Sequence, residues 1–305
     1  MRMRLGRPSL AAHAGLFTLP GAQPDGLSVT FLGVATLLVS DGDSALLTDG
    51  FFSRPSLART ALRPLHPDTG RISAALSRAG VTRLDAVIPV HTHYDHALDS
   101  ATVAEHTGAT LIGGSSAAVL GRAHGLPEER IVVARPGHTM RLGSFDVTLI
   151  AGAHCPPDRA PGEIVGPLSL PARVRAYRCG EAWSTVIGHR PSGDSLLVVG
   201  SAGYVPGALA GRRADVAYLG VGQLGIQPAD YLVRYWEETV RRVGARRVVL
   251  IHWDDFFRPL DKDLRPIARR FDDLDRSIRI LTALAHRDQV ALQLPTVWQR
   301  ADPWA

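Results

Sequence analysis

The stretch VIPVHTHYDHALDS, residues 87–100, places three histidines and one aspartate within six positions, directly after an apolar run. Side chains of an extended segment alternate between its two sides, so His91 and His93 point the same way and can bind one metal ion. Asp95 and His96 follow where the chain is expected to turn into a helix, and there they can face a second ion or orient the first. A cluster this dense predicts a metal site rather than a histidine-rich turn.

Further ligands are expected at the ends of other strands. His154 closes the apolar segment FDVTLIAGAH, and His252 closes RRVVLIH. Asp49 ends a third such segment, SALLTD, and is expected behind the metal ligands or as an occasional ligand itself. Imidazoles with an occasional carboxylate favour Zn²⁺, as one or two ions, with iron or manganese as alternatives.

Short apolar segments alternate with helical ones along the chain. LSVTFLG, ATLLVS and SALLTDG predict three successive strands, and LDAVIPVH, ATLIGG, RIVVA and FDVTLIAGAH continue the series. WSTVIGH, SLLVVGS, ADVAYLGV and RRVVLIHW predict further strands in the second half. Strands that meet helices in both halves predict an α/β protein with two sheets packed together and covered by helices. The helices are expected near residues 71–80, 98–107, 114–124, 227–242 and 261–274.

The composition is that of an ordinary soluble α/β chain of 305 residues with a formal charge of +5. Nearly all its basic residues are arginines, Lys262 being the only lysine, and they form no long runs, so nucleic-acid binding is not expected.

The N-terminal apolar stretch is interrupted and makes a poor signal peptide and no membrane span. Two cysteines, Cys155 and Cys179, do not make a disulfide framework, which favours a reducing, cytoplasmic compartment. The oligomeric state is left open.

The segment from residue 155 to 175, CPPDRAPGEIVGPLSLPARVR, carries five prolines and no clear period. A long structureless loop in a compact domain is usually functional or disordered. Because it begins beside His154, we expect a lid or pocket wall, with a surface insertion as the alternative. Arginines in and near the loop favour an anionic substrate: Arg159, Arg173, Arg175 and Arg178. Trp253, Phe256 and Phe257 are candidates for an apolar pocket wall or for core packing.

The segment HTHYDH resembles the HxHxDH signature of the metallo-β-lactamase fold superfamily. The resemblance covers about residues 27–290, which leaves an N-terminal extension of residues 1–26 and a C-terminal tail of residues 291–305. It implies a single domain, a four-layer αββα sandwich with metals at one edge between the sheets. HYDH and the later IHW look most like the branch of L-ascorbate-6-phosphate lactonase and N-acylphosphatidylethanolamine-hydrolysing phospholipase D.

The resemblance also implies which residues bind which ion. One metal would be held by His91, His93 and His154. The other would be held by Asp95, His96 and His252. Asp49 matches the superfamily's early strand-end aspartate.

One departure concerns the metal bridge. The superfamily usually carries Gly-Asp-Thr/Ser-Gly after the strand that corresponds to SLLVVG, and that aspartate bridges both metals. This chain has GSAG at residues 200–203, with Ser201 in the place of the aspartate. Either the second metal is weak or absent, or another carboxylate forms the bridge. Asp254 and Asp255 are candidates, and a solvated turn or helix cap is the alternative for each.

The expected activity is hydrolysis of a small-molecule ester, lactone or phosphodiester, because a metal lowers the pKa of bound water towards neutrality. Asp95 would orient that water. No Gly-x-Ser-x-Gly or phosphate-binding glycine motif supports a serine or nucleotide hydrolase. Two alternatives stay open: an iron-dependent redox enzyme on the same fold, and a non-catalytic, metal-stabilised binding protein.

Overall fold

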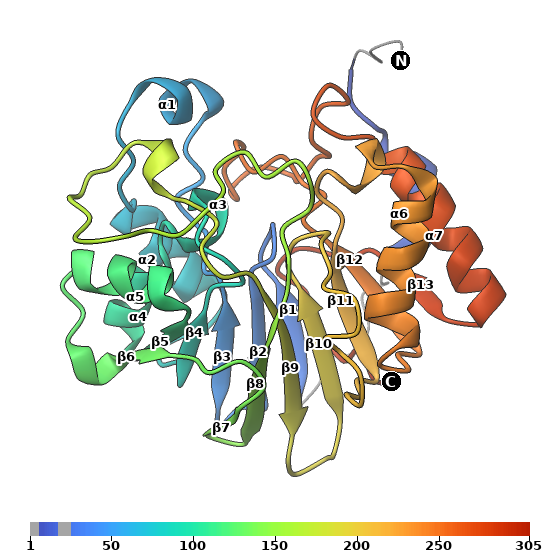
Figure 1. Ribbon diagram of the computed structural model, residues 1–305, viewed down its shortest axis with the longest axis horizontal. Helices are drawn as coiled ribbons and strands as arrows, with labels where there is room; N and C mark the ends of the chain where they lie inside the picture. The colour runs from blue at the N-terminus through green and yellow to red at the C-terminus, as the bar shows by residue number, and fades with distance from the viewer. Residues whose placement is uncertain (1–5, 18–25) are drawn as a thin grey trace.

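The computed structural model describes residues 6–17 and 26–305 and contains two seven-stranded mixed sheets that face each other (Figure 1). The first sheet has the order β14-β1-β2-β3-β4-β5-β6. Its strands are β14 (Arg300–Ala301), β1 (Ser28–Phe31), β2 (Leu37–Ser40), β3 (Ala45–Thr48), β4 (Ala86–Ile88), β5 (Thr110–Gly113) and β6 (Ile131–Val133).

The second sheet has the order β13-β12-β11-β10-β9-β8-β7. Its strands are β13 (Ala291–Gln293), β12 (Arg247–Ile251), β11 (Val216–Gly220), β10 (Ser195–Val199), β9 (Trp183–His189), β8 (Phe145–Ala151) and β7 (Thr139–Leu142). The strands expected from the apolar segments are all present, and β7, β13 and β14 are additions.

Helices cover the outer face of each sheet, so the four-layer αββα sandwich is confirmed (Figure 1). On the side of the first sheet lie α1 (Leu57–Leu62), α2 (Thr69–Arg78), α3 (Tyr94–Ala97), α4 (Ser100–Thr107) and α5 (Ser115–Ala123). On the side of the second sheet lie α6 (Ala229–Trp236), which continues into a π-helical segment (Glu237–Arg241), and α7 (Leu274–Asp288). Short 3₁₀ turns occur at Leu10–Leu16, Glu128–Arg130, Val174–Ala176 and Leu224–Ile226.

The alternation of side chains along each strand separates two hydrophobic layers. In β3, Leu46 points into the core between the sheets, whereas Leu47 packs under the helices. In β4, Ile88 and Val87 divide in the same way. The strands are apolar on both faces because both faces are covered, as expected for the inner layers of a sandwich.

The helix expected at residues 261–274 is wrong. Residues 265–267 fold back along residues 253–255, with a bridge between Asp254 and Pro266. Proline lacks the N–H that a helix interior needs, which favours this extended pairing. The helix begins instead at Leu274, where the Asp273 side chain accepts a hydrogen bond from the backbone of Arg276.

The chain ends contribute to the sheets. The boundary expected at residue 290 lies between α7 and β13, and the residues beyond it add β13 and β14 at an edge of each sheet. Phe17 forms a bridge with Leu294, whereas residues 1–5 and 18–25 of the expected extension lie outside the described residues. Within the described ranges, no helix is long and apolar enough to cross a membrane.

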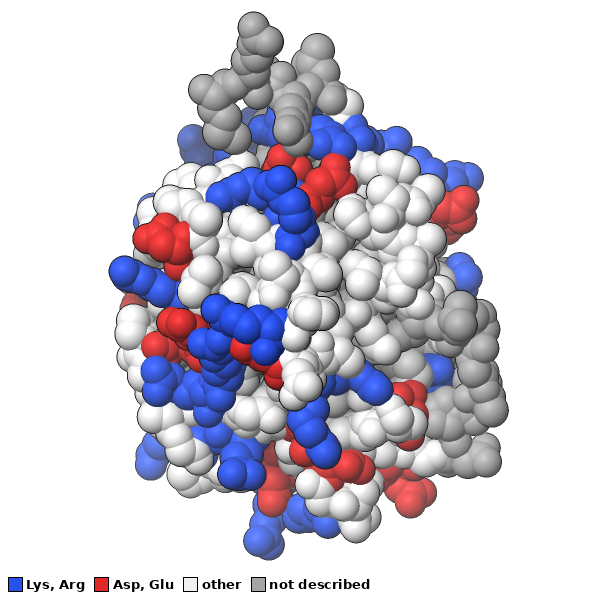
Figure 2. Space-filling view, turned by 90° about the vertical axis from the view of Figure 1, so that its right-hand side faces the viewer, with Lys and Arg blue, Asp and Glu red and all other residues white. Residues whose placement is uncertain are grey.

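The face that carries α6 and α7 has arginines interleaved with acidic side chains (Figure 2). Several of them pair one helical turn apart, as Arg242 does with Glu238 at 2.7 Å and Arg241 with Glu237 at 3.6 Å. The excess of positive charge on this face is therefore partly neutralised by neighbouring carboxylates.

Candidate metal centre

The candidate site lies at the edge where strands of both sheets end. In the first sheet β3 and β4 run parallel, which brings Asp49 and His91 to the same edge. In the second sheet β8 and β10 are both antiparallel to β9, and β10, β11 and β12 are parallel. Consequently His154, Ser201 and His252, which follow β8, β10 and β12, come together at one edge.

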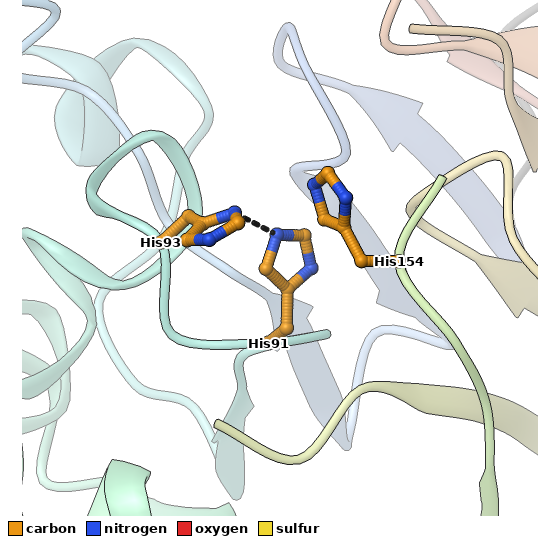
Figure 3. A group of neighbouring side chains, drawn as sticks. All are labelled: His91, His93 and His154. Carbon is orange, nitrogen blue, oxygen red and sulfur yellow. Dashed lines mark hydrogen bonds between the residues drawn. The ribbon is translucent and has the colours of Figure 1, made fainter. Parts of the chain in front are cut away.

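The first group consists of three imidazole rings that converge on one point (Figure 3). His91 Nε2 lies 3.1 Å from His93 Nδ1, and the His154 ring centre lies 5.0 Å and 4.7 Å from those of His91 and His93. One nitrogen of each ring lies within 4.8 Å of the others. Two nitrogens bound tetrahedrally to one zinc ion are about 3.3–3.4 Å apart, so the spacing fits a metal.

Hydrogen bonds outside this group fix the tautomers of two rings. His93 Nε2 lies 3.3 Å from the carbonyl oxygen of Ala160 and 3.2 Å from Asp158 Oδ1, so this nitrogen carries the proton. His154 Nδ1 donates to the carbonyl oxygen of Cys155 at 2.7 Å. His93 Nδ1 and His154 Nε2 are thereby left as lone-pair donors facing the centre of the group, as metal binding requires.

The second group combines one carboxylate with two imidazoles. His96 Nε2 lies 3.1 Å from His252 Nε2, and Asp95 Oδ2 lies 3.5 Å from His252 Nε2 and 3.8 Å from His96 Nε2. His96 Nδ1 donates to Asp49 Oδ2 at 2.7 Å, while Asp49 Oδ1 accepts from the backbone N–H of Val90. Asp49 therefore lies behind His96 and holds its Nε2 towards the group.

Burial and charge act differently on the two groups. Burial holds the pKa of His91 well below its usual range and lowers the pKa of His154 to about 4. Burial alone would also lower the pKa of His96, but the carboxylates of Asp49 and Asp95 outweigh it and raise that pKa. The three-histidine group is therefore neutral near pH 7, which is the protonation state that metal binding requires.

Ser201 lines the cavity beside both groups. Its hydroxyl accepts a hydrogen bond from the backbone N–H of Cys155 at 3.0 Å, which ties the end of β10 to the loop after β8. The position therefore carries no negative charge.

Asp254 is completely buried and forms an ion pair with Arg54, whose side chain is also fully buried. Its other oxygen accepts from the backbone N–H of Val34 at 2.8 Å. The carbonyl of Val34 in turn accepts from the backbone N–H of His252 at 2.6 Å. Asp254 lines the cavity, but its carboxylate is committed to this network.

Asp255 is buried as well and pairs with two arginines. Its Oδ2 lies 3.0 Å from Arg265 and 2.9 Å from Arg7. Its Oδ1 accepts from the backbone N–H of Phe257 at 3.3 Å, the hydrogen bond of a turn.

A cavity of about 420 Å³ adjoins both groups. The loop after β8 contributes Arg159, Ala160, Val174 and Arg175 to its wall. This loop crosses the top of the sandwich towards α1, where Leu65 pairs with Ala172 (Figure 1). Of the aromatic residues considered as pocket wall, Phe256 and Phe257 line the cavity, whereas Trp253 belongs to the core between the sheets.

Several residues of the site were not anticipated from the sequence. Asp158 lies in the proline-rich loop, and nothing in its local pattern marks it as a partner of His93. Tyr94 stands inside the histidine cluster, but only the fold shows that it lines the cavity. Ile267 and Phe271 lie in the segment expected to be a helix. Cys155 and Cys179 are buried free thiols.

The sandwich and the two residue groups define a metal-binding α/β protein of the metallo-β-lactamase fold. Residues 46–253 match the family described as the beta-lactamase superfamily domain, about two thirds of the chain, and the chain therefore belongs to that family.

Known proteins similar to this chain include a UPF0173 metal-dependent hydrolase of Myxococcus xanthus, 28% identical over 127 residues. That alignment covers 41% of this chain and 38% of the relative's length. Among solved structures, Igni18, a metallo hydrolase of Ignicoccus hospitalis, has a TM-score of 0.51 at 14% identity and covers 91% of this chain and 95% of its own. CmlA, a diiron β-hydroxylase of Streptomyces venezuelae, has a TM-score of 0.54 at 14% identity, covering 96% of this chain and 58% of its own.

Proposed function

We propose that the protein is a metal-dependent hydrolase of a small, anionic ester, lactone or phosphodiester. The observation that carries the proposal is the neutral three-histidine group, in which backbone and carboxylate acceptors hold His93 and His154 with their lone pairs inward. A Myxococcus relative and the Igni18 structure, both named as hydrolases of the metal-dependent type, support the same activity.

The donor set fits one or two zinc-type ions. Three neutral imidazoles suit the first ion, and two imidazoles with the Asp95 carboxylate suit the second. When bound, such an ion would supply Lewis acidity and a water that ionises near neutral pH. The chain's own contribution is to fix the imidazoles, and Asp49 does so for His96.

We assign Asp95 the catalytic role of orienting the attacking water. Burial alone would raise the pKa of Asp95, but His96 and His252 outweigh it and hold the pKa well below its usual range. The carboxylate therefore stays ionised and accepts a hydrogen bond rather than donating a proton. Its neighbours His96 and His252 fix its position.

The charge of the site favours an anionic substrate. The two groups offer Asp95 as their single carboxylate ligand, and Ser201 adds no second one. Arg159 and Arg175 line the cavity and, within the described residues, form no hydrogen bond or ion pair. A phosphate or carboxylate of the substrate would meet these free guanidinium groups.

Asp254 and Asp255 serve in this proposal as structural carboxylates rather than as a replacement bridge, since each is paired with arginine.

We also place the chain, on the segments HYDH and IHW, nearest the lactonase and phospholipase D branch named above. On the face shown in Figure 2, arginines are interleaved with acidic side chains, and this supports our proposal that nucleic acid is not a partner. The cytoplasm is the compartment we propose, in keeping with the two free thiols.

The test is hydrolysis of a panel of phosphodiesters, lactones and carboxylic esters by chelator-treated protein, before and after zinc is restored. Turnover should depend on the metal, and Arg175→Ala should raise KM on anionic substrates at unchanged metal content. Arg173→Ala, in the same loop but outside the cavity wall, is the matched control. Bound metal without turnover on any substrate would favour the binding protein instead.

An iron-dependent oxidation on this fold is the second candidate, since CmlA is a diiron β-hydroxylase with the same architecture. Iron as the metal retained on purification, with no hydrolysis in the zinc form, would favour it.

A further inference from the structure

A row of aromatic rings leads away from the second metal group. Phe256 packs edge-on against His252, with ring centres 5.9 Å apart. Phe257 packs against Phe256 at a tilt of 46°, with ring centres 4.6 Å apart, and the Phe271 ring centre lies 6.5 Å from that of Phe257. Tyr94, the residue before Asp95, packs edge-on against Phe256, with ring centres 6.4 Å apart. The four rings line the same cavity.

Two of the four rings, Phe257 and Phe271, are not explained by packing of the fold, whereas Tyr94 and Phe256 pack against a third hydrophobic cluster that contains Phe51. Phe257, Ile267 and Phe271 belong to none of the three core clusters, although each is partly buried and lines the cavity. Apolar side chains gathered around a cavity and left outside the core are typical of a ligand-binding surface. They are placed there by the segment that follows β12, which folds back through the pairing of residues 253–255 with residues 265–267.

The loop after β8 adds a mixed surface to the same cavity. Val174 is apolar, whereas Arg159 and Arg175 are cations that form no ion pair with any described residue. Leu57, at the start of α1, is 40% exposed and also lines the cavity. The cavity therefore offers one wall for apolar groups and two cations for an anionic group.

We propose that the substrate is amphipathic: an alkyl or aryl group lies against Phe256, Phe257 and Phe271, and an anionic group meets Arg159 or Arg175. The aromatic row begins at His252, so the apolar group leads directly away from the scissile bond. This inference rests on the proposed hydrolase function, and it specifies the kind of molecule that the site accepts. The cavity of about 420 Å³ is large enough for a drug-sized ligand, beyond what a single phosphate or acetate would fill.

The experiment uses metal-free full-length protein and straight-chain carboxylates from butanoate to decanoate, with binding measured by calorimetry. Each methylene that reaches the aromatic wall should tighten binding about three- to fourfold until the wall is covered. Phe257→Ala should weaken octanoate about five- to tenfold while changing butanoate less than about twofold. Phe257→Leu, which keeps an apolar side chain, should restore most of the affinity.

Two leucines of α1 provide a matched control. Leu57→Ala removes an exposed leucine that lines the cavity and should weaken octanoate binding, whereas Leu62→Ala removes one that is 69% exposed outside the cavity and should not. Thermal unfolding of each variant separates loss of binding from loss of fold.

An affinity that does not depend on chain length, or a dependence that is unchanged in Phe257→Ala, would overturn the proposal. Because no metal and no turnover are involved, the result is independent of the hydrolase assignment. Chain-length-dependent binding together with a failure to hydrolyse any ester would keep the amphipathic ligand and refute the hydrolase.

Discussion

At the residue scale, the two nitrogens of each imidazole have different partners. His96 donates a hydrogen bond from Nδ1 to Asp49, and its Nε2 faces His252. His93 has the opposite orientation, with Nε2 bound by Ala160 and Asp158 and Nδ1 facing His91. The lone pairs that face each group are thus set by hydrogen bonds to the opposite nitrogen of each ring.

The substitution Asp49→Asn tests whether Asp49 fixes the tautomer of His96. An amide in place of the carboxylate weakens the hold on the His96 tautomer and removes a nearby negative charge, so zinc affinity at the second group should fall about 10–100-fold. The three-histidine group should change less than about threefold. Competitive zinc titration measures both, with Asp43→Asn in the exposed β2–β3 turn as the control. Equal loss at both groups would contradict a role specific to His96.

The substitution Ser201→Asp tests whether the lack of a bridging carboxylate at this position weakens the second metal group. Two nearby dications repel each other, and a shared carboxylate offsets part of that repulsion. In the wild type, gentle chelation should therefore remove the ion of the second group first. The substitution should tighten the second group, because residue 201 lines the cavity beside both groups. Two equally tight ions in the wild type, with no gain in the variant, would show that another group already supplies the bridge.

At the scale of elements, the loops that follow the strands contain unusual backbone. Asp49 has φ 55°, His252 has φ 58° and Arg54 has φ 40°, all in the left-handed region and none of them glycine. Such conformations are unfavourable and persist only where surrounding contacts enforce them. For His252 the contacts include the hydrogen bond of its N–H to Val34, which itself has φ 52°.

Arg54→Ala should destabilise this arrangement. It leaves the Asp254 carboxylate buried without its cation, which costs about 3–5 kcal/mol when a buried ion pair is broken. Urea unfolding of metal-free protein measures the change in free energy of unfolding. Arg141→Ala, which breaks an exposed pair with Asp146 at 3.9 Å, is the control and should cost less than about 1 kcal/mol. A loss below about 1 kcal/mol in Arg54→Ala would mean that water reaches Asp254.

The strands could be predicted from the sequence more accurately than the segments that connect them. Continuous apolar runs marked the inner strands because both faces of each sheet are buried. The HTHYDH spacing marked two candidate ligands of each group. Asp158 and Arg54 escaped notice because their partners, His93 and Asp254, are 65 and 200 residues away in the chain. The expected helix at residues 261–274 failed because long-range pairing of Pro266 with Asp254 decides the structure there.

At the scale of the whole molecule, buried titrating groups give opposing pH dependences. Burial raises the pKa of Asp99 to about 6 from 3.8, so its stabilising effect is lost as the pH rises from about 4 to about 6. The imidazole of His154 has a lowered pKa in the folded protein. Its contribution to the free energy of unfolding is therefore lost as the pH falls through about 6.5 towards 4.

The substitution Asp99→Asn isolates the contribution of the Asp99 carboxyl group to the pH dependence of stability. The difference in free energy of unfolding between wild type and variant should change by at most about 3 kcal/mol between pH 4 and pH 6, in favour of the variant at the higher pH. Urea unfolding of both metal-free proteins across this range measures it. A difference that does not vary with pH would mean that Asp99 is ionised throughout, held by its hydrogen bonds from Phe52 and Ser53.

The central claim, that two groups from both halves of the chain bind metal, is tested most directly by metal analysis of purified protein. Elemental analysis after desalting should find at least one zinc-type ion per wild-type chain. His91→Ala should lose that tightly held ion, while His138→Ala, an exposed histidine outside the site, should retain it. Wild-type protein without stoichiometric metal after incubation with zinc, or a His91→Ala variant that binds as much as the wild type, would contradict the account.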